Sequence, residues 1–128
     1  MTAKLVLIVE DNERSMKLER DVLALHGYRT LEAGTGEEGV ELAVGHTPDL
    51  ILMDIRLPGI NGIEALSRLR ADERTQCIPV VALTSSATDE DREHLRRAGF
   101  DGHLVKPIDL KHFLSEVAAK CGASVAEA

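Results

Sequence analysis

Aromatic side chains are scarce in this sequence, which has one Tyr, two Phe and no Trp. With so few rings, a stacking platform for nucleic-acid bases or a flavin sandwich is difficult to build. Basic residues are also in the minority, because 15 Lys and Arg stand against 22 Asp and Glu and leave a formal net charge of −7. That charge opposes binding to phosphate backbones and anionic membranes. We therefore expect neither nucleic acid nor a membrane as a partner.

Cysteines and long apolar runs are scarce as well. Cys77 and Cys121 form no CxxC pair, so we expect two reduced thiols rather than a disulfide framework or a structural zinc site. The N-terminal apolar run covers residues 5–9, which is too short for a signal-peptide core or a bilayer span. We therefore expect a cytoplasmic protein.

The chain has the length and the apolar content of a single domain, with 128 residues of which 44% are hydrophobic. We expect this domain to cover residues 1–121 and a flexible C-terminal tail to cover residues 122–128. Met1 and this tail favour a complete chain over a domain cut from a larger protein.

Five short apolar runs rich in branched residues recur along the chain. They lie at residues 5–9, 28–33, 50–53, 80–83 and 104–105. Three of them are almost continuously apolar, which is typical of strands covered on both faces.

Helical patterns separate these runs. Apolar stripes are formed by Leu18, Val22 and Leu25, by Ile63, Leu66 and Leu69, and by Leu110, Phe113, Leu114, Val117, Ala118 and Cys121. The stretch 88–98 is different, because it offers only Leu95 and Ala98 for burial. Thr88 is a plausible N-cap there, and acids precede arginines in the order that suits the helix dipole. We expect this helix to be loosely held.

The alternation of strands and helices predicts βα units with right-handed crossovers. The expected fold is a small, doubly wound α/β domain with a five-stranded parallel sheet and five helices.

Polar residues follow four of the five strands, at the sheet edge where ligands bind in such folds. They are Glu10 and Asp11, Asp54, Thr84, and Lys106. Three carboxylates brought this close raise one another's pKa unless a cation joins them. Oxygen ligands without His or Cys favour Mg²⁺. We expect Asp11 and Asp54 to bind Mg²⁺ directly and Glu10 to bind it through water.

A carboxylate beside Mg²⁺, a Lys and a Thr hydroxyl are the components of a phosphoryl-transfer site. Asp54 is the candidate nucleophile and would become an aspartyl phosphate. Mg²⁺ and Lys106 would neutralise the phosphoryl oxygens, while Thr84 would donate a hydrogen bond to them.

The spacing of Glu10-Asp11, Asp54, Thr84 and Lys106-Pro107 over residues 4–121 resembles the receiver domain of two-component response regulators. The phrases "VLIVEDNERSMKL", "PDLILMDIRLPGINGIEAL" and "IPVVALTSSA" further resemble stand-alone, single-domain receivers of the DivK type, which control cell-cycle and polarity signalling.

The resemblance implies a CheY-like, flavodoxin-like sheet of order 2-1-3-4-5. It implies that Asp54 accepts phosphate from a histidine kinase or a histidine phosphotransfer protein in a phosphorelay. Mg²⁺ would be held by Asp11, Asp54 and the backbone carbonyl of Arg56. It also implies a cis bond between Lys106 and Pro107, where proline makes the cis isomer accessible.

In such receivers phosphorylation draws the position of Thr84 inward and rearranges one face, formed here by residues 88–98, 104–105 and 110–121. A downstream protein would bind that face. The chain would be a signalling protein that assists its own phosphorylation and dephosphorylation rather than an ordinary enzyme. We expect a monomer, with a weak dimer as the alternative.

One switch position departs from the family pattern. His103 stands where an aromatic Tyr or Phe is common, so the coupling would be weaker or sensitive to pH. Arg56 and Ser86 occupy positions that tune the lifetime of the phosphate in the family.

Two other functions are weighed against this one. A Mg²⁺-dependent phosphatase with an Asp nucleophile is disfavoured, because Ile55-Arg56-Leu57 lacks the second Asp that would act as general acid. A constitutive pseudo-receiver is disfavoured because all five site residues are present. Taken one at a time, each site residue is also compatible with a loop start, a helix cap or a solvated charge.

Overall fold

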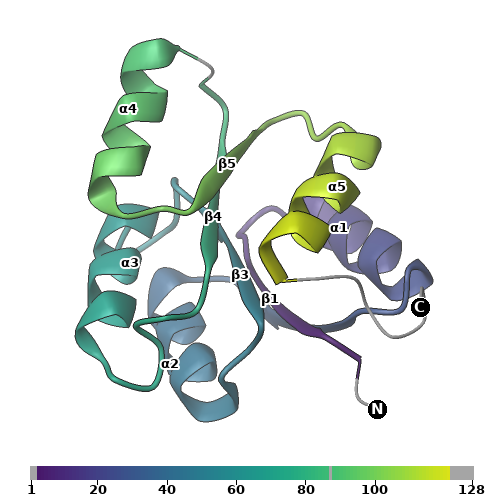
Figure 1. The fold of residues 1–128 in the computed structure, drawn as a ribbon, viewed down its shortest axis with the longest axis horizontal. Helices are drawn as coiled ribbons and strands as arrows, with labels where there is room; N and C mark the ends of the chain where they lie inside the picture. Colours follow the sequence, from purple (N-terminus) through teal and green to yellow (C-terminus); the bar gives the residue numbers. More distant parts are fainter. Residues whose placement is uncertain (1–2, 87, 122–128) are drawn as a thin grey trace.

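A computed structural model of the chain describes residues 3–86 and 88–121. These residues form five strands and five helices in alternation (Figure 1). In chain order the elements are β1 (Leu5–Val9), α1 (Glu13–Leu25), β2 (Arg29–Ala33), α2 (Gly36–His46), β3 (Leu50–Asp54), α3 (Gly62–Ala71), β4 (Val80–Thr84), α4 (Asp89–Ala98), β5 (Gly102–Val105) and α5 (Leu110–Cys121).

The strands form one parallel sheet in the order β2-β1-β3-β4-β5, which confirms the predicted topology. The register aligns the strand ends, since Val9 of β1 pairs with both Ala33 of β2 and Met53 of β3. At the other side of β3, Asp54 pairs with Leu83 of β4. The residues that follow these strands therefore emerge at one edge of the sheet.

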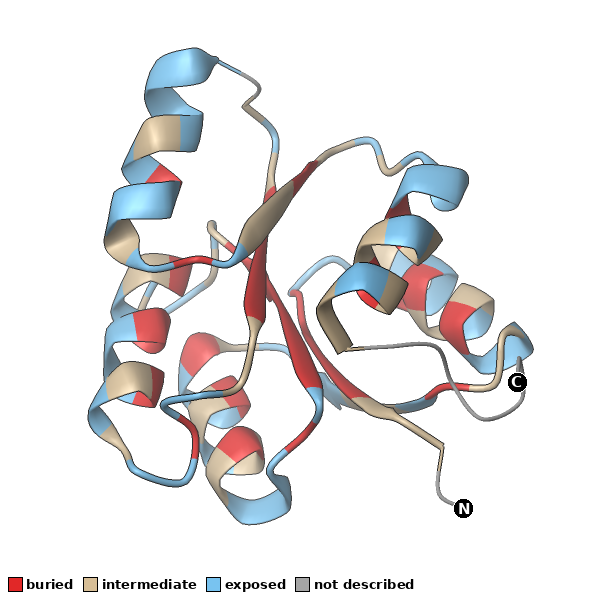
Figure 2. Cartoon of the chain, viewed as in Figure 1, coloured by how far each residue is buried: buried red, intermediate tan, exposed pale blue. Residues whose placement is uncertain are grey.

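Helices cover both faces of the sheet, with α1 and α5 on one side and α2, α3 and α4 on the other (Figure 1). Each face of the sheet carries its own hydrophobic core, and alternate residues of a strand point into one core or the other, as the two-residue period of a strand requires. In β1, for example, Leu7 packs toward α2 and α3 while Ile8 packs toward α1 and α5. Figure 2 shows the result, in which burial is concentrated along the strands and on the inner sides of the helices.

The apolar stripe expected in α1 was wrong. Leu18 is 45% exposed and Leu25 is 83% exposed, while Val22 is only partly buried. The buried face instead carries Met16, Glu19 and Leu23. Both sets of positions follow helical spacing, and the buried one was missed because a charged residue stands in its centre.

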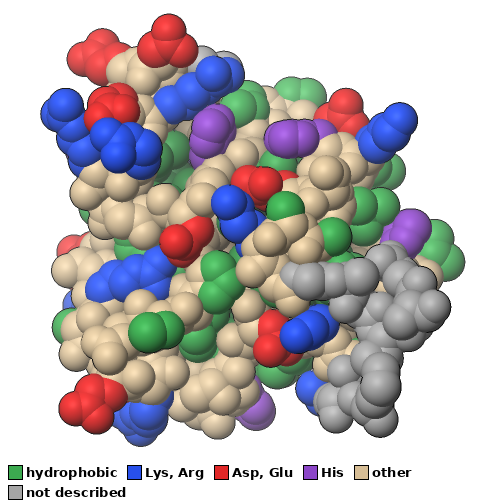
Figure 3. Space-filling view, in the orientation of Figure 1, with side chains coloured by type: hydrophobic (Ala, Val, Ile, Leu, Met, Phe, Trp, Pro, Cys, Tyr) green, Lys and Arg blue, Asp and Glu red, His purple; other side chains and the backbone are tan. Residues whose placement is uncertain are grey.

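The N-cap and the sparse burial expected for α4 are confirmed, while its loose attachment stays a prediction. Thr88 caps it, because Thr88 Oγ1 accepts a hydrogen bond from Asp91 N at 3.1 Å. Within Asp89–Ala98, all of which the structure describes, Leu95 is the one buried residue. Figure 3 shows acidic and basic side chains gathered over this helix. Packing therefore holds α4 through a narrow contact.

Two further expectations concern the C-terminal tail and the membrane. The tail predicted at 122–128 lies outside the described residues. None of the helices in 3–86 and 88–121 has the length and apolar content needed to cross a bilayer.

Candidate functional site

Backbone hydrogen bonds bring the ends of β3, β4 and β5 into one row. Ile55 N donates to Leu83 O at 3.1 Å, and Lys106 N donates to Thr84 O at 2.8 Å. On the other side of β3, Glu10 N continues the ladder by donating to Ala33 O at 3.0 Å. The ladder thus places the carboxylates, the hydroxyl and the ammonium of the predicted site at one edge.

Lys106 joins two of the predicted carboxylates. Its Nζ lies 2.7 Å from Glu10 Oε1 and 2.7 Å from Asp54 Oδ2. Glu10 and Asp54 are both buried, so this ammonium is the cation that compensates them within the described site. Burial alone would lower the pKa of Lys106, but its hydrogen bonds and the charges of Asp54 and Glu10 outweigh that effect and raise the pKa.

The backbone after β3 fixes the Asp54 side chain. Asp54 Oδ1 accepts a hydrogen bond from Arg56 N at 2.9 Å. Gly62 begins α3 directly against this strand end, where Gly62 N donates to Ile55 O at 3.0 Å. A Cβ on Gly62 would lie 2.5 Å from Asp54 O, a separation that no real side chain tolerates. Glycine is therefore needed at position 62 for α3 to approach the site.

The three acidic residues form a group that fits a divalent cation. Carboxylate oxygens of Glu10, Asp11 and Asp54 all lie within 4.8 Å of one another. Asp11 is exposed, so the group opens toward solvent on that side. Glu10 Oε2 is buried and has no hydrogen-bond partner within the described part of the chain. A hard cation such as Mg²⁺ suits this set of oxygen donors.

The raised pKa of Glu10 also favours a bound cation at this site. Burial, followed by the neighbouring Asp54, raises the pKa of Glu10 to about 7, even though Lys106 acts to lower it. One ammonium is thus insufficient to keep this cluster fully ionised at neutral pH. An added divalent cation would favour the ionised form.

Thr84 lies at the rim of a cavity of about 420 Å³ that also borders Asp54 and Lys106. Thr84 Oγ1 accepts a hydrogen bond from Ser86 N at 3.1 Å. The exposed side chain of Arg56 borders the same cavity. The residues predicted to bind the metal or the phosphoryl group therefore lie around one space, with Thr84 on the opposite side of Asp54 from Glu10. The predicted switch residue His103 borders a different hollow. The role of the Arg56 carbonyl as a metal ligand stays a prediction.

Two further expectations concern β5 and its end. The Lys106–Pro107 bond is cis, the isomer that the family resemblance implies. His103 is partly buried in β5, and burial followed by the charge of Arg92 lowers its pKa. His103 is therefore neutral at neutral pH, like the aromatic residues common at this position.

Sequence reasoning missed one acidic residue beside the site, Glu19 of α1. Its side chain is buried, and neither carboxylate oxygen has a hydrogen-bond partner among the described residues. Burial, with the nearby charge of Glu10, raises the pKa of Glu19 to about 8. The available signal was the helical spacing of Glu19 with Met16 and Leu23.

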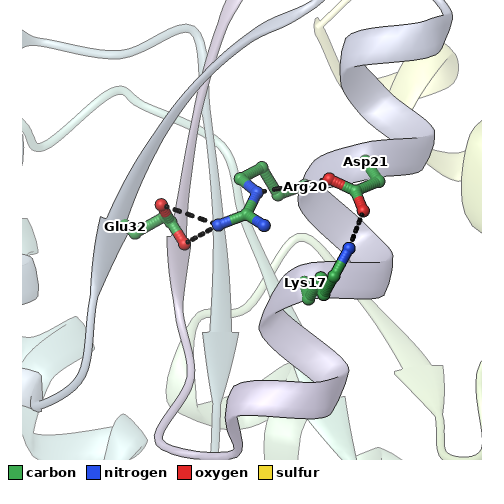
Figure 4. A network of polar contacts seen from close by, with 4 residues as sticks. All are labelled: Lys17, Arg20, Asp21 and Glu32. Carbon is green, nitrogen blue, oxygen red and sulfur yellow. Dashed lines mark hydrogen bonds and ion pairs between the residues drawn. The ribbon is translucent and has the colours of Figure 1, made fainter.

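A surface network borders the Asp11 side of the site (Figure 4). Arg20 of α1 lies 3.0 Å from Glu32 of the edge strand β2, and Lys17 lies 2.8 Å from Asp21. All four side chains are substantially exposed, so these pairs add little stability. The Arg20–Glu32 pair does join α1 to β2, beside a hollow of about 450 Å³ that Glu10 and Asp11 line.

Relatives with known descriptions share both the sequence and the fold. The polar-differentiation response regulator DivK of Brucella ovis is 43% identical over 119 residues, which cover 93% of this chain and 97% of DivK. DivK of Brucella anthropi is 42% identical with the same coverage.

Solved structures of receiver domains and response regulators share the fold of this chain. The receiver domain of the sensor histidine kinase PA1611 from Pseudomonas aeruginosa, described with a magnesium ion in its active site cleft, is 32% identical with a TM-score of 0.87. That match covers 95% of this chain and 100% of the other. Chemotaxis response regulator CheY4 of Vibrio cholerae is 25% identical with a TM-score of 0.88, covering 92% and 98%.

The family itself is shown by a match over most of the chain. The sequence profile described as the response regulator receiver domain matches residues 6–118, which include each of the predicted site residues. This chain therefore belongs to the response regulator receiver domain family.

Proposed function

We propose that this chain is a single-domain response regulator that accepts a phosphoryl group on Asp54 from a phosphohistidine of a histidine kinase or phosphotransfer protein. The observation that carries the proposal is the position of Asp54, with Lys106 Nζ 2.7 Å from its Oδ2 and with Glu10 and Asp11 close enough to share a cation. A carboxylate held between cations is arranged to receive a phosphoryl group.

In the proposed transfer, an Asp54 carboxylate oxygen attacks phosphorus. A P–O bond forms as the P–N bond of the phosphohistidine breaks, and the electron pair of that bond leaves with the imidazole nitrogen. Lys106 neutralises a phosphoryl oxygen, and the Thr84 hydroxyl donates a hydrogen bond to another. Mg²⁺, when bound by Asp11, Asp54 and the Arg56 carbonyl with Glu10 acting through water, would neutralise the remaining phosphoryl charge.

The output follows from the same site. Thr84 would move toward the phosphoryl group, and the face of α4, β5 and α5 would change and control a protein partner. The narrow packing of α4 supports this assignment, because weakly held elements are the ones that move. The resemblance to polar-differentiation regulators supports a cytoplasmic role in polarity or cell-cycle signalling.

The experiment is phosphorylation by acetyl phosphate, with and without Mg²⁺, read by intact mass on the wild type and Asp54→Asn. One Mg²⁺-dependent phosphoryl adduct, absent from the variant, is the expected result. A wild type that stays folded and unmodified would contradict the proposal and favour constitutive binding. Turnover of small phosphoesters would favour a phosphatase instead.

A further inference from the structure

The first two turns of α4 border the same cavity as the proposed phosphoacceptor. Asp91 and His94 of α4 line that space of about 420 Å³ together with Asp54, Thr84 and Ser86. The side chains of α4 therefore contribute to the surroundings of the site as well as to the outer face of the domain.

Ser86 connects Thr84 to this helix through two hydrogen bonds. Its backbone N donates to Thr84 Oγ1 at 3.1 Å, and its side-chain Oγ donates to Asp91 Oδ2. Asp91 is itself fixed in the capped turn, where its backbone N donates to Thr88 Oγ1 at 3.1 Å. A continuous chain of contacts therefore runs from the hydroxyl of Thr84 to the start of α4.

The bond to Asp91 matters because little else holds this end of the helix. Leu95, in the second turn, is the one buried residue of Asp89–Ala98. The hydrogen bond from Ser86, followed by the one from Thr88, lowers the pKa of Asp91, so its carboxylate is ionised at neutral pH. A charged acceptor makes the Ser86 contact stronger than a bond between neutral groups.

We propose that Asp91 is a positioning residue that, through Ser86, restrains Thr84 and the first turn of α4 and so opposes phosphorylation of Asp54. The inference rests on the proposed function and adds a restraint to its switch. Two effects act in the same direction. Movement of Thr84 toward a phosphoryl group carries Ser86 with it and stretches the contact with Asp91. A phosphoryl group also brings about two negative charges into the cavity that Asp91 lines.

The consequence is a coupling between the two sites. An interaction that is present before phosphorylation and lost after it lowers the affinity of the protein for the phosphoryl group. Removal of the Asp91 carboxylate should therefore raise that affinity. Removal of the Ser86 hydroxyl should do the same without changing any charge, which separates the hydrogen bond from simple repulsion.

The test is the binding of beryllofluoride, a phosphoryl mimic that bonds to a carboxylate oxygen, in the presence of Mg²⁺. We expect Ser86→Ala to tighten binding about fivefold and Asp91→Ala to tighten it at least as much, because Asp91→Ala also removes a negative charge. The double variant should bind no more tightly than the better single variant, because both changes remove the same contact. Asp89→Ala is the matched control, since Asp89 is an acid of the same turn that faces Arg92 instead.

Failure of the restraint and failure of the proposed function give different results. Unchanged affinity in Asp91→Ala, an equal effect of Asp89→Ala, or effects of the two single variants that multiply in the double variant would each overturn the restraint. A wild type that does not bind beryllofluoride, or an Asp54→Asn variant that binds it equally well, would instead defeat the proposed function.

A second measurement tests the restraint without any phosphoryl chemistry. The Ser86 amide should be protected from hydrogen exchange by its bond to Thr84, and Asp91→Ala should raise its exchange rate while Asp89→Ala should not. Equal protection of Ser86 in the wild type and in Asp91→Ala would show that Asp91 does not hold it.

Discussion

The end of β3 and the helix α4 border the same cavity but are held in different ways. Every residue of Leu50–Asp54 is buried, and Asp54 is fixed by hydrogen bonds to Arg56 and Lys106. Helix α4 has Leu95 as its one buried residue and Ala98 as a partly buried one. The ion pairs of Glu93 with Arg96 and Arg97 are exposed and lie within the helix, so they do not attach it to the sheet.

This difference shows how one small domain can hold Asp54 in a fixed position while a neighbouring helix stays weakly packed. Close packing at β3 determines where Asp54, the proposed phosphoacceptor, lies, because packed interiors do not deform gradually. Because Leu95 is the one buried residue of α4, we expect this helix to rearrange at low cost. The side of the cavity that carries Asp54 is closely packed, and the side formed by α4 is weakly held.

The largest expected effect comes from removing one buried leucine in each of two neighbouring helices. Leu66→Ala in α3 should lower the free energy of unfolding by about 3 to 4 kcal/mol, because Leu66 is completely buried. Leu95→Ala should cost about 2 kcal/mol and act mainly on α4. Denaturant unfolding gives the totals, and amide hydrogen exchange shows where protection is lost.

The comparison fails if Leu95→Ala reduces amide protection in β1 and β3 as strongly as in α4. That result would mean that α4 unfolds only with the whole domain.

A smaller effect is expected from crowding the rigid side. Gly62→Ala places a methyl group 2.5 Å from Asp54 O and should destabilise the domain by about 2 kcal/mol. It should also slow phosphorylation, because the strand end that carries Asp54 must shift. Gly45→Ala is the control: it lies in a helix where an added Cβ meets nothing within 4 Å, so a gain of up to about 1 kcal/mol is expected. Phosphorylation of Gly62→Ala at the wild-type rate would contradict the rigidity assigned to this edge.

The rigid side was also the more predictable one. A parallel sheet brings strand ends to one edge whatever the details of its loops, so Asp54, Thr84 and Lys106 were placed correctly from their positions after apolar runs. The weakly packed α4 was predictable too, because Leu95 and Ala98 are the apolar residues of its stretch.

Contacts that depend on loop geometry or on an exception to patterning were not predictable. The Ser86 contact with Asp91 depends on how the chain turns after β4, and no sequence period encodes that turn. Glu19 was overlooked because hydrophobic patterning assigns a charged residue to the surface. Leu18 and Leu25 were misplaced because the same patterning assigns apolar residues to the core, whereas both are exposed.

Glu19 of α1, on the other face of the sheet from α4, offers a test in which the domain gains stability. Glu19→Leu replaces a buried carboxyl group with an apolar side chain of similar size between Met16 and Leu23. We expect an increase in the free energy of unfolding of about 1 to 2 kcal/mol at pH 8.

The pH dependence gives the stricter readout for Glu19. Its pKa is about 8 in the folded protein against an ordinary pKa of 4.5, so between these values the folded state keeps a proton that the unfolded state releases. Wild-type stability should therefore fall as pH rises from about 4.5 to about 8, and Glu19→Leu should reduce that fall. Glu41→Gln, a change at an exposed position of α2, is the control. An unchanged slope in Glu19→Leu would mean that Glu19 does not hold the proton.

The smallest effect is expected at β5, where the rigid sheet meets α4. Burial and the charge of Arg92 lower the pKa of His103, and Glu116 only partly offsets them. Because the unfolded state then binds a proton at a higher pH than the folded state, stability should fall as pH drops below about 6.5. The fall should be less than about 1 kcal/mol, since the ring is partly exposed.

His103→Phe should remove this part of the pH dependence, and the hollow of about 460 Å³ beside Arg92 has room for the larger ring. His46→Asn, at an exposed position far from β5, should leave that dependence in place. If unfolding measured at pH 7 and pH 5 changes equally in wild type and His103→Phe, then His103 does not sense pH, and β5 belongs with the rigid sheet rather than with the responsive helix beside it.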